Sequence, residues 1–124
     1  MSKVVIIEDD VLMRSLMAEW LKEEGYHVEE VALNEVNTIA AADVVIVNVY
    51  MPRKLGAERL RAARKAYPDV PTIAVSAQFR PGVECSGSAA RTLGVDRVIA
   101  KPLGREALLD AVRSVIGRRA ATTA

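Results

Sequence analysis

The stretch Val44-Val45-Ile46-Val47-Asn48 (residues 44–48) decides the fold of this chain. Its four consecutive β-branched residues predict a strand that is buried on both faces, because a half-exposed strand would alternate apolar with polar residues. Asn48 ends the run, and Met51-Pro52 follows soon after. The segment therefore predicts a buried strand with a polar side chain at its carboxyl end.

Further apolar runs on both sides of this segment predict the rest of a sheet. Strands are expected at residues 4–7, 27–32, 44–49, 72–76 and 97–100. Apolar residues at helical spacing predict helices at 12–21, 57–67 and 108–116, and a short, weak helix is expected at 34–42. The apolar stripe of the first helix, which includes Leu12, Leu16 and Trp20, is expected to face the core, and Gly25 ends this helix. The segment 78–94 predicts a long loop with at most two turns of helix. Strands that alternate with helices predict the α/β class, a parallel sheet covered on both faces.

Length and composition fit one domain, which we expect over residues 1–118, with a flexible tail at 119–124. The net charge of +1 favours neither nucleic acid nor an anionic membrane as a partner. We interpret the basic residues between 53 and 65 as a solvated helix face. Cys85 is the single cysteine, and the sequence has neither a signal-peptide pattern nor a run long enough to cross a bilayer. We therefore expect a cytoplasmic protein.

Polar side chains stand at the predicted carboxyl ends of the strands, where open parallel sheets bind their ligands. They are Glu8, Asp9, Asp10, Asn48, Ser76 and Lys101. Three adjacent acids repel one another and need a cation, and oxygen ligands of this kind suit Mg²⁺. Lys101 supplies a positive charge for a phosphoryl oxygen, and Ser76 supplies a hydroxyl donor. The set predicts a site for phosphoryl chemistry.

Each of these residues also has an ordinary structural interpretation. Asp9 and Asp10 could cap the helix that follows them. Ser76 could simply end its strand, Lys101 could be a surface lysine, and Asn48 could be a structural amide with satisfied hydrogen bonds. Their placement on one rim of the predicted sheet favours the site.

Five short motifs occur at these strand ends. They are E-D-D at 8–10, D-x-x-x-R at 10–14, M-P-x-x-x-G at 51–56, S-A at 76–77 and K-P at 101–102. In this order they resemble the receiver domain of two-component response regulators, over residues 3–118. The resemblance implies a doubly wound, flavodoxin-like fold with five strands in the order 2-1-3-4-5, here with a weak or irregular fourth helix. It also implies that Asp9 and Asp10 bind Mg²⁺ with the backbone carbonyl of Tyr50, and that Ser76 and Lys101 are the catalytic pair that contacts the phosphoryl group.

The sequence departs from the family in three places: the irregular segment 78–94, where the family has its fourth helix, and two functional positions. Asn48 stands at the phosphoacceptor position, where the family has an aspartate. An amide has no anionic oxygen to attack a phosphohistidine, so formation of an acyl phosphate is lost, and Mg²⁺ should bind more weakly. Val98 stands where the family generally has the aromatic residue that moves during activation.

The prediction is therefore a single-domain receiver of a phosphorelay, a signalling domain rather than an enzyme, which is not phosphorylated at residue 48. Asn48 is either native, which would make the chain a pseudo-receiver, or a substitution that blocks phosphorylation. The expected partners are a sensor histidine kinase or histidine phosphotransfer protein and an unknown downstream protein. The alternative is an interaction module that ignores phosphate and uses the last helix, the Val98 strand and the loop near Cys85. A nucleotide- or flavin-binding enzyme is disfavoured, because the first loop is acidic.

Overall fold

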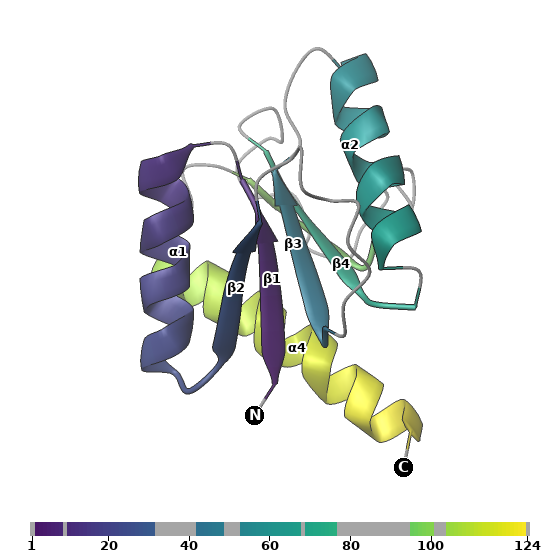
Figure 1. The fold of residues 1–124 in the computed structure, drawn as a ribbon. Helices are drawn as coiled ribbons and strands as arrows, with labels where there is room; N and C mark the ends of the chain where they lie inside the picture. Colours follow the sequence, from purple (N-terminus) through teal and green to yellow (C-terminus); the bar gives the residue numbers. More distant parts are fainter. Residues whose placement is uncertain are drawn as a thin grey trace.

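The computed structural model describes residues 2–8, 10–31, 42–48, 53–67, 69–76, 95–100 and 104–123, with the backbone alone at 53–59, 76, 100 and 117–123. A five-stranded parallel sheet in the order β2-β1-β3-β4-β5 forms its centre (Figure 1). The strands are β1 (Lys3–Ile7), β2 (His27–Val31), β3 (Val44–Asn48), β4 (Thr72–Ser76) and β5 (Arg97–Ala100). The predicted fold class and strand order are confirmed.

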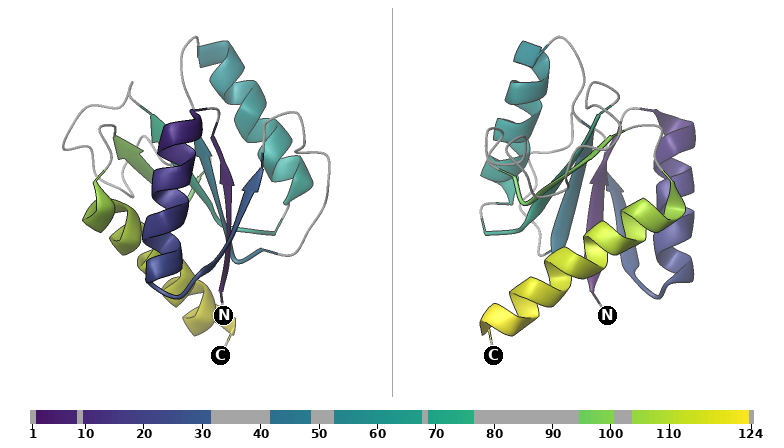
Figure 2. Two further views of the ribbon diagram at one scale, coloured as in Figure 1. Left: turned by 60° about the vertical axis from the view of Figure 1, so that its left-hand side comes forward. Right: turned by 180° about the vertical axis from the view of Figure 1, so that it is seen from behind.

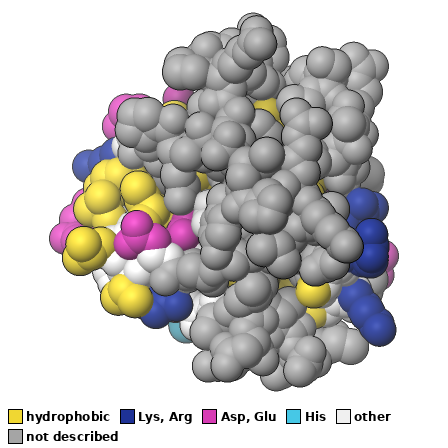
Figure 3. Space-filling model, turned by 90° about the horizontal axis from the view of Figure 1, so that it is seen from above, with side chains coloured by type: hydrophobic (Ala, Val, Ile, Leu, Met, Phe, Trp, Pro, Cys, Tyr) yellow, Lys and Arg dark blue, Asp and Glu magenta, His cyan; other side chains and the backbone are white. Residues whose placement is uncertain are grey.

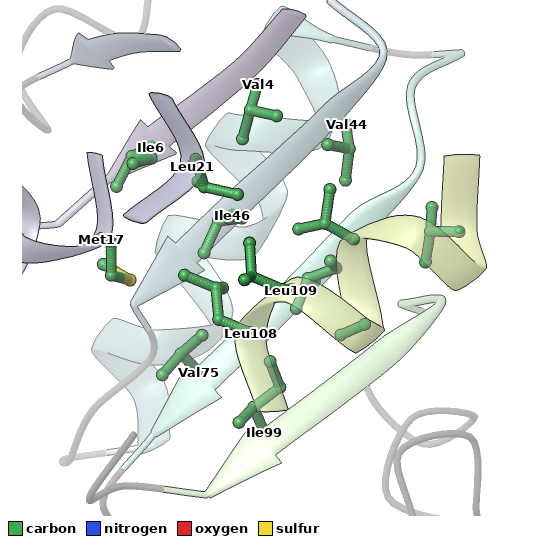
Figure 4. Close-up of a cluster of buried hydrophobic side chains, with 14 of the residues drawn as sticks. Val4, Ile6, Met17, Leu21, Val44, Ile46, Val75, Ile99, Leu108 and Leu109 are labelled. Atoms are coloured by element: carbon green, nitrogen blue, oxygen red, sulfur yellow. The ribbon is translucent and has the colours of Figure 1, made fainter. Parts of the chain in front are cut away.

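Two apolar layers pack on the two faces of the sheet, because side chains alternate in direction along each strand. Helices α1 (Val11–Glu23) and α4 (Arg105–Thr123) cover one face, and α2 (Arg53–Ala66) covers the other (Figures 1 and 2). Ile6, Ile46 and Leu109 are buried in the first layer (Figure 4). Val47 and Leu60 are buried in the second.

Two aspartates at the amino ends of strands fix the register of the sheet. The Lys3 N–H donates to Asp43 Oδ2 (2.7 Å), and the Asp43 N–H donates to the Lys3 carbonyl (2.8 Å). Thr72 and Asp96 form the same reciprocal pair between β4 and β5, with both bonds at 2.9 Å. A slip of one residue would break both bonds and turn every side chain to the opposite face, so these pairs oppose slippage.

Helix α1 ends at the glycine that the sequence indicates. Gly25 has a φ of 93° and donates its N–H to the Lys22 carbonyl at 3.0 Å. Tyr26 donates to the Leu21 carbonyl at 3.1 Å. This left-handed cap satisfies the last carbonyls of the helix, and glycine adopts it without strain.

The predicted buried stripe of α1 is wrong at two positions. Leu12 is 83% exposed and Leu16 39% exposed, whereas Met17 and Leu21 are fully buried. At 100° per residue Leu12 lies about 140° around the helix from Met17, outside the buried arc. Trp20 packs against the core but is only partly buried.

The remaining differences concern the ends of elements. Helix α4 is helical through Thr123, beyond the end expected near residue 118, while the flexibility of residues 119–124 stays a prediction. The predictions for residues 34–41 and 78–94 lie outside the described residues. Of the helices that the structure describes, none is both long and apolar enough to span a bilayer.

Candidate functional site

The strand register brings the polar strand ends to one edge of the sheet. Glu8 follows Ile7, which pairs with Val47, so Glu8 lies level with Asn48. Ser76 lies one residue beyond the β4 partner of Asn48 and itself pairs with the last residue of β5. Neighbouring strands are about 4.8 Å apart. The backbones of these positions on β1, β3 and β4 are therefore adjacent.

Glu8 and Asn48 place two buried polar side chains next to each other. They are 1% and 4% exposed, respectively. Each stands two residues after a member of the first apolar layer, Ile6 and Ile46, so both belong to the same face of the sheet. Asn48 Oδ1 is buried and receives no hydrogen bond in the described part of the chain. A buried oxygen without a donor is costly, and such an atom fits a cation or a donor from a bound group.

Asp10 holds the turn between β1 and α1. Its backbone is extended, and its Oδ1 accepts the N–H groups of Leu12 (3.0 Å) and Met13 (3.2 Å), which makes it the N-cap of α1. Its own N–H donates to Glu8 Oε1 at 3.1 Å. Within the described residues, the second carboxylate oxygen of Asp10 makes no hydrogen bond. The structural interpretation of Asp10 as a cap is thus correct, and one oxygen is still available for a ligand.

Arg14 reaches back from α1 to the same turn. Its Nη1 donates to the backbone carbonyl of Glu8 at 3.2 Å, and its Nε lies 3.5 Å from Glu30 Oε1 on β2. Sequence reasoning identified the D-x-x-x-R spacing but gave Arg14 no role. The spacing carried the signal, since a helical side chain points toward the amino end of its helix.

Four of the six predicted site residues cannot be placed by their side chains. Asp9, Tyr50 and Lys101 lie outside the described residues, and Ser76 is described by its backbone alone. Their roles stay predictions. Asp10 and Asn48 lie at the carboxyl edge of the sheet, as expected.

The side-chain oxygen atoms at this edge fit a hard cation as ligands. Asn48 Oδ1, the free oxygen of Asp10 and the carboxylate of Glu8 are all oxygens, the ligand type that Mg²⁺ takes. Among residues 2–8, 10–31 and the other described ranges, no three His, Cys, Asp or Glu side chains gather closely enough to hold a metal. The described residues therefore supply part of a ligand set.

An exposed apolar patch lies beside this edge, on the first turns of α1. Val11 is 60% exposed, and Leu12 and Leu16 join it. Figure 3 looks onto the edge and shows hydrophobic side chains with acidic neighbours on the α1 side. The sequence did not reveal this patch, because Leu12 and Leu16 belong to the apolar stripe that was expected to face the core.

Comparison with known proteins identifies the family of this fold. The model of the response regulator receiver domain matches residues 4–113. The transcriptional regulatory protein CpxR of Escherichia coli K12 is 29% identical over 123 residues, which are 95% of this chain and 50% of CpxR. The regulatory protein VirG of Rhizobium rhizogenes is 34% identical over 124 residues, 96% of this chain and 50% of VirG. The chain thus spans half the length of these curated relatives.

Solved structures agree with the fold. A CheY-like receiver domain protein of Methanospirillum hungatei has a TM-score of 0.78 at 22% identity, with 98% of both chains covered. Chemotaxis protein CheY4 of Vibrio cholerae has a TM-score of 0.74 at 26% identity, covering 93% of this chain and 98% of CheY4. The response regulator TrrA of Thermotoga maritima, solved with Mg²⁺ and BeF, has a TM-score of 0.70 at 24% identity, covering 93% of this chain and 99% of TrrA.

Proposed function

Because this chain belongs to the response regulator receiver domain family, we propose that it is a cytoplasmic receiver domain whose Asn48 prevents phosphorylation at that position. Receiver domains act in two-component signalling, and they are signalling modules rather than enzymes. In a pseudo-receiver, signalling would rest on binding to partners and on metal occupancy.

The observation that supports this proposal is the state of residue 48. Asn48 ends the central strand, is 4% exposed and lies level with the buried Glu8. That is the position from which a nucleophile would face the carboxyl edge of the sheet. An amide there cannot form an acyl phosphate, since it has no anionic oxygen.

We assign the other site residues by the family motifs that they match. Asp9, Asp10 and the Tyr50 carbonyl would hold Mg²⁺, and Ser76 and Lys101 would contact a phosphoryl oxygen. When bound, the ion supplies positive charge to phosphate oxygens and relieves repulsion among the acids. Asn48 contributes a neutral oxygen where a carboxylate would contribute charge, so the affinity for Mg²⁺ should be reduced.

The exposed patch of Val11, Leu12 and Leu16 suits the partner that a receiver requires. A histidine kinase or histidine phosphotransfer protein must approach the carboxyl edge, and the patch lies next to the N-cap Asp10. Exposed apolar clusters rimmed by charge are typical of protein interfaces. We propose that this patch contacts such a partner even though phosphoryl transfer to Asn48 is blocked.

Mass spectrometry tests the central claim. The chain is incubated with acetyl phosphate and Mg²⁺, and residue 48 should gain no phosphoryl group. A gain of one phosphoryl group at residue 48 would contradict the proposal. Phosphorylation of Ser76 would be a separate finding, because it leaves the claim about Asn48 intact.

The second candidate is an interaction module that ignores phosphate and metal. The aliphatic side chain of Val98 favours it, because valine has no aromatic ring that could move during activation. Val98 is 1% exposed and packs in the second apolar layer. The side chain of Val98 is buried and therefore cannot belong to the interaction surface expected on its strand. A titration with Mg²⁺ separates the two candidates: an unchanged melting temperature and unchanged Trp20 fluorescence favour the interaction module.

A further inference from the structure

The turn that carries the proposed metal ligands is held from outside by one guanidinium group. Arg14 Nη1 donates to the Glu8 carbonyl at 3.2 Å, directly before Asp9 and Asp10. The backbone N–H of Arg14 also donates to the Asp10 carbonyl at 2.9 Å. Both ends of the short turn are therefore bonded to the same residue of α1.

A carboxylate on the neighbouring edge strand orients the guanidinium. Arg14 Nε lies 3.5 Å from Glu30 Oε1, a separation that makes an ion pair, and Nε makes no hydrogen bond among the described residues. The side chains are 22% and 36% exposed, so solvent only partly screens the pair. Glu30 pairs in register with Ile6 of β1, which places it beside the strand that leads into the turn.

Ligand carbonyls and carboxylates depend on such outer contacts for their orientation. Groups that hold metal ligands in place typically contribute 10–100-fold to metal affinity. Asp10 already has one carboxylate oxygen bonded to two amides of α1, so a small rotation of the turn would redirect its other oxygen. The planar, forked guanidinium can reach a carbonyl and a carboxylate together, whereas a lysine offers a single point of charge.

We propose that Arg14 is a positioning residue for the metal ligands. Its guanidinium fixes the main chain at Glu8, its backbone N–H binds the carbonyl of Asp10, and Glu30 orients the guanidinium. This inference rests on the proposed Mg²⁺ site and adds to it a dependence on β2, an edge strand that carries none of the assigned ligands. A substitution of Glu30 should therefore lower the affinity for Mg²⁺, because it loosens Arg14.

The test measures Mg²⁺ midpoints from the melting temperature and from Trp20 fluorescence of the full chain. R14M keeps an unbranched apolar side chain and removes the guanidinium, so its midpoint should rise at least about tenfold. R14K and E30Q should give smaller rises. R113M is the matched control, because Arg113 on α4 also forms an ion pair with a glutamate, Glu24 at the end of α1, at 3.1 Å. The Mg²⁺ midpoint of R113M should stay unchanged.

A second measurement is independent of the metal. Amide hydrogen exchange at Asp10, whose N–H donates to Glu8 Oε1 at 3.1 Å, should be at least about tenfold faster in R14M and unchanged in R113M. If the parent chain responds to Mg²⁺ but R14M has the same midpoint and the same exchange at Asp10, the role of Arg14 is refuted alone. If neither the melting temperature nor the Trp20 fluorescence of the parent chain responds to Mg²⁺, both the metal site and this inference are wrong.

Discussion

Asn48→Asp is the substitution that tests the electrostatics of the site most directly. It keeps the shape of the side chain and adds one negative charge at a position that is 4% exposed. The buried Glu8 lies level with it on the adjacent strand. The variant therefore places two carboxylates side by side, in addition to the neighbouring Asp9 and Asp10.

The magnitude follows from the strand spacing. Adjacent strands are about 4.8 Å apart, so two like charges about 5 Å apart repel by about 3 kcal/mol at an effective dielectric constant of about 20, and by less than 1 kcal/mol in water. Since the edge of the sheet lies between these limits, we expect N48D to lose about 1–3 kcal/mol of unfolding free energy without Mg²⁺. That is a sizeable share of the 5–15 kcal/mol typical of a domain.

The sign of the pH dependence follows from the same repulsion. The neighbouring acids raise the pKa of the new carboxyl above its unfolded value of about 3.9. The folded variant then binds this proton more tightly than the unfolded chain. The deficit of N48D is therefore absent below about pH 4, and it appears as the pH rises through the folded pKa of the new carboxyl.

Urea denaturation at neutral pH, with and without Mg²⁺, measures the effect. Mg²⁺ should recover most of the lost stability of N48D and should stabilise the parent chain less. N48A is the uncharged control and should be nearly neutral, because the amide oxygen that it removes has no hydrogen-bond donor in the described structure. Equal stability of N48D and the parent without metal, or an equal gain from Mg²⁺, would refute the reasoning.

Three further predictions concern the fold. Asp96→Ala should lower the free energy of unfolding in urea by about 1.5–3 kcal/mol, because its Oδ2 accepts the first N–H of β4 at 2.9 Å. The control Asp69→Ala, at an exposed turn, should change it by less than about 0.5 kcal/mol. Equal effects of the two substitutions would contradict this. Ile46→Ala, at a position with 0% exposure, should cost about 2–5 kcal/mol, whereas Val11→Ala, at 60% exposure, should change stability by less than about 0.5 kcal/mol. Burial raises the pKa of the Tyr67 hydroxyl above its ordinary value of 10.0, so the folded state holds this proton more tightly and stability should fall as the pH rises above about 10; Tyr67→Phe should flatten that fall in melting temperature, and an unchanged pH profile would contradict the assignment.

The strands could be predicted from the sequence because a strand that is buried on both faces needs a continuous run of apolar residues. A run such as residues 44–47 admits few alternatives when glycine, proline and charge are absent from it. Gly25 was predicted for a similarly local reason, since its φ of 93° is unfavourable for other residues. These features depend on nearest neighbours along the chain.

Features that depend on distant segments could not be predicted. The spacing of apolar residues in α1 indicates a helix but does not say how wide its buried arc is, so Leu12 was assigned to the core although it is 83% exposed. The contact of Arg14 with Glu30 needs β2 to lie beside β1, which only the assembled sheet provides. The hydrogen bond between Asp96 and Thr72 of β4 is of the same kind, because these two residues are 24 positions apart in the sequence.

The amide at residue 48 has a consequence for the whole domain. In a receiver with a carboxylate at this position, repulsion among buried acids lowers the stability of the metal-free fold, and an ion that binds only the folded state offsets that loss. With Asn48 the same edge carries one charge fewer, and the described core is complete without metal: Glu8 bonds Asp10, Asp10 caps α1 and Arg14 bonds Glu8. Folding of this chain then does not require a bound metal ion, although a bound ion would still stabilise the folded state. A domain of this kind can present the α1 patch to a partner whether or not the ion is bound, because the helix that carries the patch is fixed by hydrogen bonds within the protein.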